Sequence, residues 1–249
     1  MAKETRDTLK NYFKSGSLPS ADQFSDLIDS TLNMRDEGFY KTADSGFKVA
    51  QLSEGRLISF FKNTVMKSPI WSLKMDLKNG SHKLFYLNEK NESVLTLDPD
   101  GRVGINEDAP DFELDVKGAI ASNGRIGRQA EVDNGIRANG EWQPIIDELT
   151  GCHAYEIMAG VGKRHSGKYA LLHAFALNTF GSKGKITYHQ AHYGSRCNRL
   201  KLRWKRSPEK SDTYRLEIRT KCCYGEGIYI NCFITDLWFD HFMKGCTKT

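Results

Sequence analysis

The chain opens with two short stretches in which apolar residues recur at helical spacing. Residues 5–13 form the first, and a breaker run follows at residues 15–19. Ser20 then stands three residues before Gln23, which is a capping-box pattern for the start of a helix. The next apolar positions follow the i, i+3, i+4, i+8 stripe of an amphipathic helix and are Phe24, Leu27, Ile28 and Leu32. Because two helices this short cannot bury their stripes alone, we predict a helical hairpin that docks on the rest of the chain, a second copy or another protein.

Between residues 46 and 126 the pattern changes to short apolar stretches separated by turn signals. The clearest turns are Lys-Asn-Gly at residues 78–80 and Asp-Pro-Asp-Gly at residues 98–101. Toward residue 126 the stretches hold only one or two large apolar residues each, which is too little for a sheet that stands alone. We therefore predict a β stalk over residues 41–150 in which three chains intertwine and each apolar strand face packs on the other copies.

Longer strands with clear alternation follow residue 151. In the two clearest stretches the apolar residues share one face and are Leu200, Leu202, Trp204, Tyr214, Leu216 and Ile218. The opposite face carries the cations Arg199, Lys201, Arg203, Lys205, Arg215 and Arg219. We expect a hairpin through the linker at residues 206–212, with Glu217 paired to an arginine across it. Residues 151–249 are thus predicted to form an antiparallel β-sandwich-like domain with one buried and one cationic face.

Charge divides the chain near the same place. Of the 249 residues, 39% are hydrophobic and 27% charged, and the formal net charge is +5. Residues 1–149 hold 19 Lys and Arg against 24 Asp and Glu, whereas residues 150–249 hold 17 against 7, so the net charge changes from −5 to +10. This change predicts a boundary near Gly151 and three segments, at residues 1–40, 41–150 and 151–249. All six cysteines lie beyond Gly151, and we expect them to be reduced.

Residues 100–118 read D-G-R-V-G-I-N-E-D-A-P-D-F-E-L-D-V-K-G. This stretch resembles a motif, D/N-G-x-V-G-I, a few polar residues, Pro, then L-x-V-x-G, of tail-fibre and adhesin-like proteins from phages and phage-tail-like contractile injection systems. The matching residues are Gly101, Val103, Gly104, Ile105, Pro110, Leu114, Val116 and Gly118. Leu9–Ser30 is similar to the opening of such tail-associated proteins, and the last hundred residues resemble their terminal domains more loosely. The resemblance implies a homotrimer that attaches through its N-terminus to a baseplate or tail and carries an outward C-terminal domain.

The sequence offers little for catalysis or metal binding. Gly162–Lys168 has the spacing of a phosphate-binding loop, but Tyr169 stands where a Ser or Thr would hold Mg²⁺, so we predict a basic hairpin loop. His189 and His192 are three residues apart, which places them on opposite faces of a strand, and no Cys-x-x-Cys spacing occurs. Because no triad signature is present either, we expect no enzyme, no cofactor and no metal. A pair of carboxylates that cleaves glycans is the remaining enzymatic alternative.

No apolar run approaches the roughly 20 residues that a membrane helix needs, and the polar N-terminus does not resemble a signal peptide. We therefore expect a protein made in the cytoplasm that becomes part of a phage-tail-like particle, either released or membrane-anchored.

The expected function is that of a structural, non-enzymatic, trimeric fibre, spike-surrounding or cage component. Its partners would be its own copies and baseplate or tail proteins, with the helix at Phe24, Leu27, Ile28 and Leu32 as the attachment site. The alternative is a receptor-binding module whose cationic face takes a cell-surface glycan, or an acidic protein. Nucleic acid is not expected, because no aromatic residues are interleaved with the cations on the same face.

Overall fold

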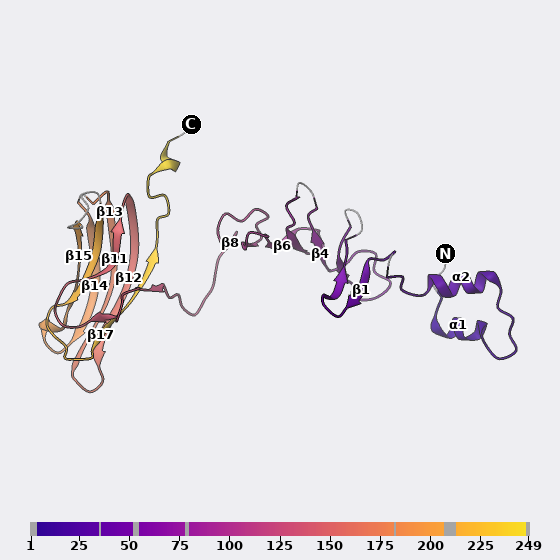
Figure 1. Cartoon of the computed structure of the whole chain (residues 1–249), viewed down its shortest axis with the longest axis horizontal. Helices are drawn as coiled ribbons and strands as arrows, with labels where there is room; N and C mark the ends of the chain where they lie inside the picture. The colour runs from indigo at the N-terminus through magenta and orange to yellow at the C-terminus, as the bar shows by residue number, and fades with distance from the viewer. Residues whose placement is uncertain are drawn as a thin grey trace. The chain divides into compact units, whose positions relative to one another are not determined.

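The computed structural model describes residues 4–34, 36–51, 55–77, 80–181, 183–206 and 213–247. It is mainly β, as predicted, and divides into two compact units, Met1–Ala121 and Ser122–Thr249, labelled by element in Figure 1. The C-terminal unit thus begins 29 residues before the boundary at Gly151 that the charge pattern suggested. The reason is strand pairing, since three strands that precede Gly151 belong to the sheets of the C-terminal unit.

The predicted helical hairpin is confirmed as α1 (Arg6–Tyr12) and α2 (Ala21–Asp29). Ser20 and Gln23 form the predicted capping box, with Ser20 N–H donating to Gln23 Oε1 over 2.9 Å. Phe13 and Phe24 meet edge to face, with ring centroids 5.3 Å apart. The stripe is shorter than predicted, because α2 ends at Asp29 and Leu32 lies beyond it.

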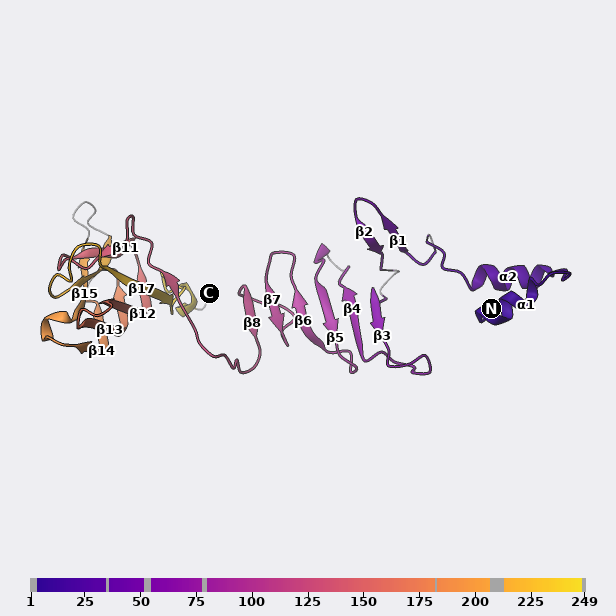
Figure 2. The same ribbon diagram turned by 90° about the horizontal axis from the view of Figure 1, so that it is seen from below.

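The rest of the N-terminal unit consists of a hairpin and a six-stranded sheet. β1 (Phe39–Thr42) and β2 (Gly46–Val49) form the hairpin, and the rings of Phe39 and Phe47 stack on it. Figure 2 shows the sheet strands side by side in one layer, in chain order: β3 (Ile58–Phe60), β4 (Trp71–Met75), β5 (Leu84–Leu87), β6 (Ser93–Leu97), β7 (Val103–Ile105) and β8 (Leu114–Val116). Neighbouring strands are antiparallel except β7 and β8, which are parallel.

The motif at residues 100–118 forms β7, β8 and the segment between them. Gly101 closes the predicted turn with φ +88°, donating its N–H to the Asp98 carbonyl over 3.0 Å. A Cβ on Gly104 would lie 2.0 Å from the carbonyl oxygen of Glu107, so only glycine fits there. Two of the three glycines of the motif, Gly101 and Gly104, therefore have a local structural reason. In the other predicted turn, Lys78 and Asn79 lie outside the described residues.

The C-terminal unit contains two antiparallel sheets that share one core. The larger has the order β10-β17-β12-β13-β14, with β9 also paired to β17, and the smaller the order β11-β16-β15. The strands are β9 (Arg128–Gln129), β10 (Ile136–Arg137), β11 (Gln143–Leu149), β12 (Cys152–Lys163), β13 (Lys168–Thr179), β14 (Lys185–Tyr193), β15 (Leu200–Arg206), β16 (Tyr214–Thr220) and β17 (Tyr229–Asp236). Two 3-10 helices, η2 (Arg196–Asn198) and η3 (Lys244–Cys246), complete the unit.

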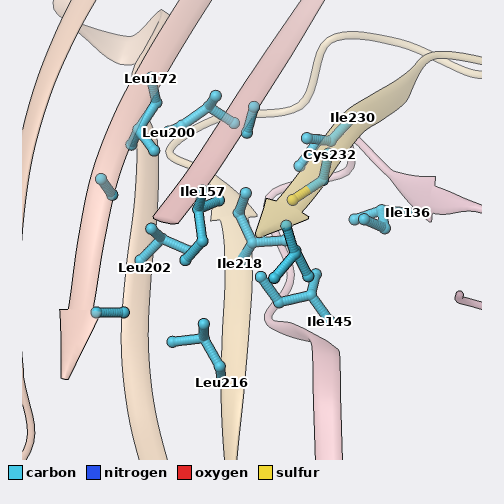
Figure 3. Packing of buried hydrophobic residues seen from close by; sticks show 14 of the residues in the cluster. Ile136, Ile145, Ile157, Leu172, Leu200, Leu202, Leu216, Ile218, Ile230 and Cys232 are labelled. Atoms are coloured by element: carbon cyan, nitrogen blue, oxygen red, sulfur yellow. The ribbon is translucent and has the colours of Figure 1, made fainter. Parts of the chain in front are cut away.

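The core is built by the inward rows of both sheets. Figure 3 shows Leu200, Leu202 and Ile218 of the smaller sheet beside Ile157 and Leu172 of the larger one. The predicted alternation is confirmed, since the apolar residues of β15 and β16 are buried, apart from the half-buried Trp204. β15 and β16 pair as the predicted hairpin, whose linker at residues 207–212 lies outside the described residues.

Two smaller expectations have clear outcomes. The basic stretch at residues 162–168 is the predicted hairpin loop, in which Lys163 and Lys168 pair across β12 and β13. The expectation of reduced cysteines is wrong for one pair, because a disulfide joins Cys197 to Cys222, whose Cα atoms are 5.5 Å apart. The loop conformations around η2 bring these two together, which the sequence spacing does not reveal.

Candidate interaction surfaces

One face of the N-terminal sheet is entirely apolar and uncovered. Strand register places thirteen apolar residues on it, and we call this set the N-terminal apolar face: Ile58, Phe60, Trp71, Leu73, Met75, Leu84, Tyr86, Leu95, Leu97, Val103, Ile105, Leu114 and Val116. None of them is buried. The buried residues of these strands all lie on the opposite face and are Ser72, Leu87, Thr96 and Gly104. The opposite face thus buries Leu87, two hydroxyl side chains and a glycine, whereas on the apolar face five residues are exposed and the other eight are half-buried.

The predicted cationic face exists, but the chain neutralises part of it. Arg203 pairs with Glu217 across β15 and β16, as predicted, with Arg203 Nε 2.6 Å from Glu217 Oε2. Arg215 Nε lies 2.8 Å from Glu217 Oε1, and Arg215 Nη1 lies 3.6 Å from an Asp147 carboxylate oxygen. The Glu217 side chain is only 2% exposed. The negative charge that these arginines require is therefore supplied within the chain.

Trp142 lies on the same face, and sequence reasoning missed it. Its ring is 4.2 Å from the guanidinium carbon of Arg203 and 4.6 Å from that of Arg219. The residue immediately precedes β11, which pairs with β16. Because Arg203 and Arg219 are 61 and 77 residues away in the chain, no local pattern connects them with Trp142.

The other predicted cations divide into two groups. Lys201 and Lys205 lie on β15 opposite Arg219 and Arg215, while Arg199 precedes the strand as the C-cap of η2. Within the described residues no carboxylate lies at ion-pair distance from Arg199, Lys201 or Lys205. Arg219, which contacts the Trp142 ring, also has no carboxylate at that distance, so in the described part of the chain these four cations are not paired with a carboxylate.

The predicted attachment helix keeps its stripe open. Phe24, Ile28 and Leu32 are 50%, 67% and 60% exposed, and only Leu27 is half-buried. Within the described part of the N-terminal unit, the apolar surface of these side chains is accessible to another molecule.

A second uncovered apolar surface lies on the outer side of the larger C-terminal sheet. We call it the C-terminal apolar face, and its exposed members are Met158, Tyr169, Leu171, Phe175, Leu177, Tyr193 and Tyr229. Gly160 and Gly162 leave grooves of about 450 and 550 Å³ on either side of Leu171. The charged group beside them, Glu156, binds Arg125 and lies 2.8 Å from His173 Nε2. The apolar alternation of these strands does not predict this surface.

A buried histidine holds the C-terminal segment. His153 is 8% exposed and stacks on His241, with ring centroids 4.2 Å apart. Its Nε2 donates to the Thr150 carbonyl over 2.9 Å, since a carbonyl can only accept, and its Nδ1 accepts from the Tyr155 hydroxyl. In the neutral ring, which burial favours, Nδ1 is the acceptor in the contact with Tyr155. Burial, and secondarily the nearby His241, lower the pKa of His153.

Among the described residues, no three His, Cys, Asp or Glu side chains gather closely enough to hold a metal ion. His189 and His192 lie on opposite faces of β14, as their spacing predicts.

No protein-family model matches the chain, and no curated protein matches it. In the described part of the chain, neither helix has the length and apolar character to cross a membrane. The case for a function therefore depends on these surfaces and on the motif at residues 100–118.

Proposed function

We propose that the protein is a structural, non-enzymatic, trimeric component of a phage-tail-like contractile injection system, as a baseplate-attached fibre, spike-surrounding or cage protein. Its class is supported by the resemblance at residues 100–118 and 9–30. Its assembly role is supported by one observation above all, the thirteen unburied residues of the N-terminal apolar face.

A one-layer sheet with an apolar face in contact with water is unstable. Apolar sheet faces are normally covered by a helix, a second sheet or a symmetry-related copy. Strands of three to five residues also bury little on their own. Three copies that turn these faces toward a common axis would bury them all. In this arrangement the open stripe of α2 attaches the trimer to a baseplate or tail protein.

The test is the mass of the full-length protein by native mass spectrometry, followed by its incorporation into particles. The proposal expects three chains per assembly and a particle that lacks the protein when the α2 stripe is changed by Phe24→Asp and Ile28→Asp. A matched control, Asp22→Ala on the exposed side of α2, leaves incorporation unchanged. A 28.2 kDa species at micromolar concentration would overturn the trimer.

A second candidate function is recognition of a cell-surface glycan or acidic protein through the cationic face. It is favoured by Lys201 and Lys205, which have no carboxylate at ion-pair distance among the described residues. Lys201→Glu with Lys205→Glu separates the two functions without disturbing Glu217. Intact particles that no longer adhere to cells support recognition, whereas failure to incorporate supports an assembly contact. Arg203 and Arg219 are unsuitable for this test, because they contact Glu217 and Trp142.

A further inference from the structure

In β13 the outward row is larger and more apolar than the row that faces the core. The inward residues are small or fully enclosed, at most 6% exposed, and are Ala170, Leu172, Ala174 and Ala176. The outward residues are Tyr169, Leu171, Phe175 and Leu177, which are 40 to 54% exposed, together with the half-buried His173 and, at the end of the strand, Thr179. A sheet that is wet on one side normally has polar residues in its outward row. The outward row of β13 therefore has the composition of a covered surface.

Neighbouring strands extend this row into the C-terminal apolar face. Met158 adds to it from β12, Tyr193 from β14 and Tyr229 from β17. For side chains of about 200 Å² each, the exposed fractions of the seven members correspond to roughly 700 Å². That area exceeds the largest apolar patch of an ordinary monomer, roughly 300–600 Å², and approaches the roughly 800 Å² that each partner buries in a standard protein interface.

The face is also free of uncompensated charge at its centre. Glu156, the carboxylate beside Met158, is bound by Arg125 and His173 of the same chain. The two grooves at Gly160 and Gly162 can accept protruding side chains of the size of Leu171. A surface that has protruding apolar side chains, grooves to receive them and no unpaired carboxylate can pack against the same surface of another copy.

We infer that the C-terminal apolar face is an interface with a second copy of this chain, an inference that rests on the proposed assembly through the N-terminal sheet. Residues 150–249 carry a net charge of +10, and the cationic face lies on the other sheet of the same unit. Contact through the cationic faces would bring like charges together, whereas contact through the apolar faces leaves them in water. Charge complementarity thus selects the apolar face for self-association.

The short connection between the two units also favours a second copy of this chain as the occupant of the C-terminal apolar face. Only residues 117–127 separate β8 from β9. Because Arg125 is bound to Glu156, the connection without such contacts is at most residues 117–124, and a chain of that length spans about 16 Å on average. Copies joined through their N-terminal sheets therefore hold their C-terminal units at an effective concentration in the millimolar range, where an interface of this area forms readily. An unrelated partner would have to compete with that concentration.

Met158 provides a direct reporter, because peroxide converts an accessible methionine to its sulfoxide. Its side chain is 39% exposed in the single chain, and Met34, at 63%, serves as the reference for peroxide dose. In the full-length assembly we expect Met158 to be oxidised roughly ten-fold more slowly than in the Leu171→Lys variant, measured by peptide mass spectrometry. Lys221→Ala, at an exposed position just after β16, is the control and leaves the rate of Met158 unchanged. An unchanged far-ultraviolet circular dichroism spectrum of Leu171→Lys verifies that the variant is folded.

Native mass and the oxidation rate together separate this inference from the proposed function. A multi-chain assembly in which Met158 reacts at the same rate in wild type and variant overturns the C-terminal interface alone. A single-chain mass overturns the proposed assembly and the interface with it. Protection of Met158 that appears only after another protein is added also overturns the inference, because the occupant would then be a different partner.

Discussion

Phe60 is the residue through which the N-terminal apolar face can be tested most sharply. It lies on β3 opposite Trp71, contacts the ring of Tyr86 with centroids 6.4 Å apart, and is 44% exposed in the single chain. Covering that fraction of a side chain of about 200 Å² removes roughly 90 Å² from water. At about 25 cal/mol per Å², this contributes roughly 2 kcal/mol per chain. Since a trimer buries three copies, Phe60→Ala should destabilise the trimer by about 6 kcal/mol, roughly a 10⁴-fold loss in its association constant.

The assay is sedimentation velocity of the full-length protein over a dilution series, with the midpoint of dissociation as the readout. Phe61→Ala is the matched control, because Phe61 has the same side chain, is 47% exposed and lies just beyond β3, outside the rows of the face. Phe60→Ala should move the midpoint to higher protein concentration, and Phe61→Ala should leave it within a few-fold. Identical midpoints for Phe60→Ala and wild type, with unchanged circular dichroism, would refute the claim that this face is buried between copies.

Three further predictions concern the stability of the two units. Arg203→Ala leaves the buried Glu217 with Arg215 alone. It should lower the free energy of unfolding by about 2 kcal/mol in urea titrations. The control, Lys205→Ala at the exposed end of β15, should change it by less than about 0.5 kcal/mol. Because burial lowers the pKa of His153 below its ordinary value of 6.5, the unfolded chain binds more protons in acid, so stability is full above pH 6.5 and falls as the pH drops below it. His153→Gln should remove up to about 1.4 kcal/mol per pH unit from the slope of the free energy of unfolding against pH. His189→Gln is the control and should leave this slope intact. An unchanged slope in His153→Gln would contradict its attribution to His153. Gly104→Ala should cost about 2 kcal/mol through the clash with the Glu107 carbonyl, while Gly118→Ala, whose Cβ would meet nothing within 4 Å, should be neutral by the same urea titration.

Local patterns predicted the elements whose rules are local. The capping box at Ser20 depends on residues three apart, and the turn at residues 98–101 depends on one glycine. The hairpin of β15 and β16 was predictable because its outward row is almost wholly charged, which leaves only one row for the core. The end of α2 at Asp29 was not predictable from spacing, since Leu32 continues the apolar periodicity after the backbone has left the helix.

Long-range pairing explains the larger differences. Residues 122–150 resemble the preceding segment in charge, yet β11 pairs with β16 about seventy residues later. Trp142 joins the arginines by the same pairing, and Cys197 reaches Cys222 only through the fold. Composition shows where charge changes along the chain, but hydrogen bonding between distant strands decides where a compact unit begins.

β13 shows why burial itself could not be assigned from apolar alternation. Both of its rows are apolar, so alternation does not distinguish them, and side-chain size would select Leu171, Phe175 and Leu177 as the core. The fold places the alanines inward, because the rings of Tyr155 and Tyr214 and the side chains of the second sheet already fill the space opposite them. Exposure to water does not favour large apolar side chains, so contact with solvent does not explain those in the outward row. A sequence rich in apolar residues on both rows of one strand is typical of a strand covered on both faces, and for β13 the described C-terminal unit provides one of these two covers.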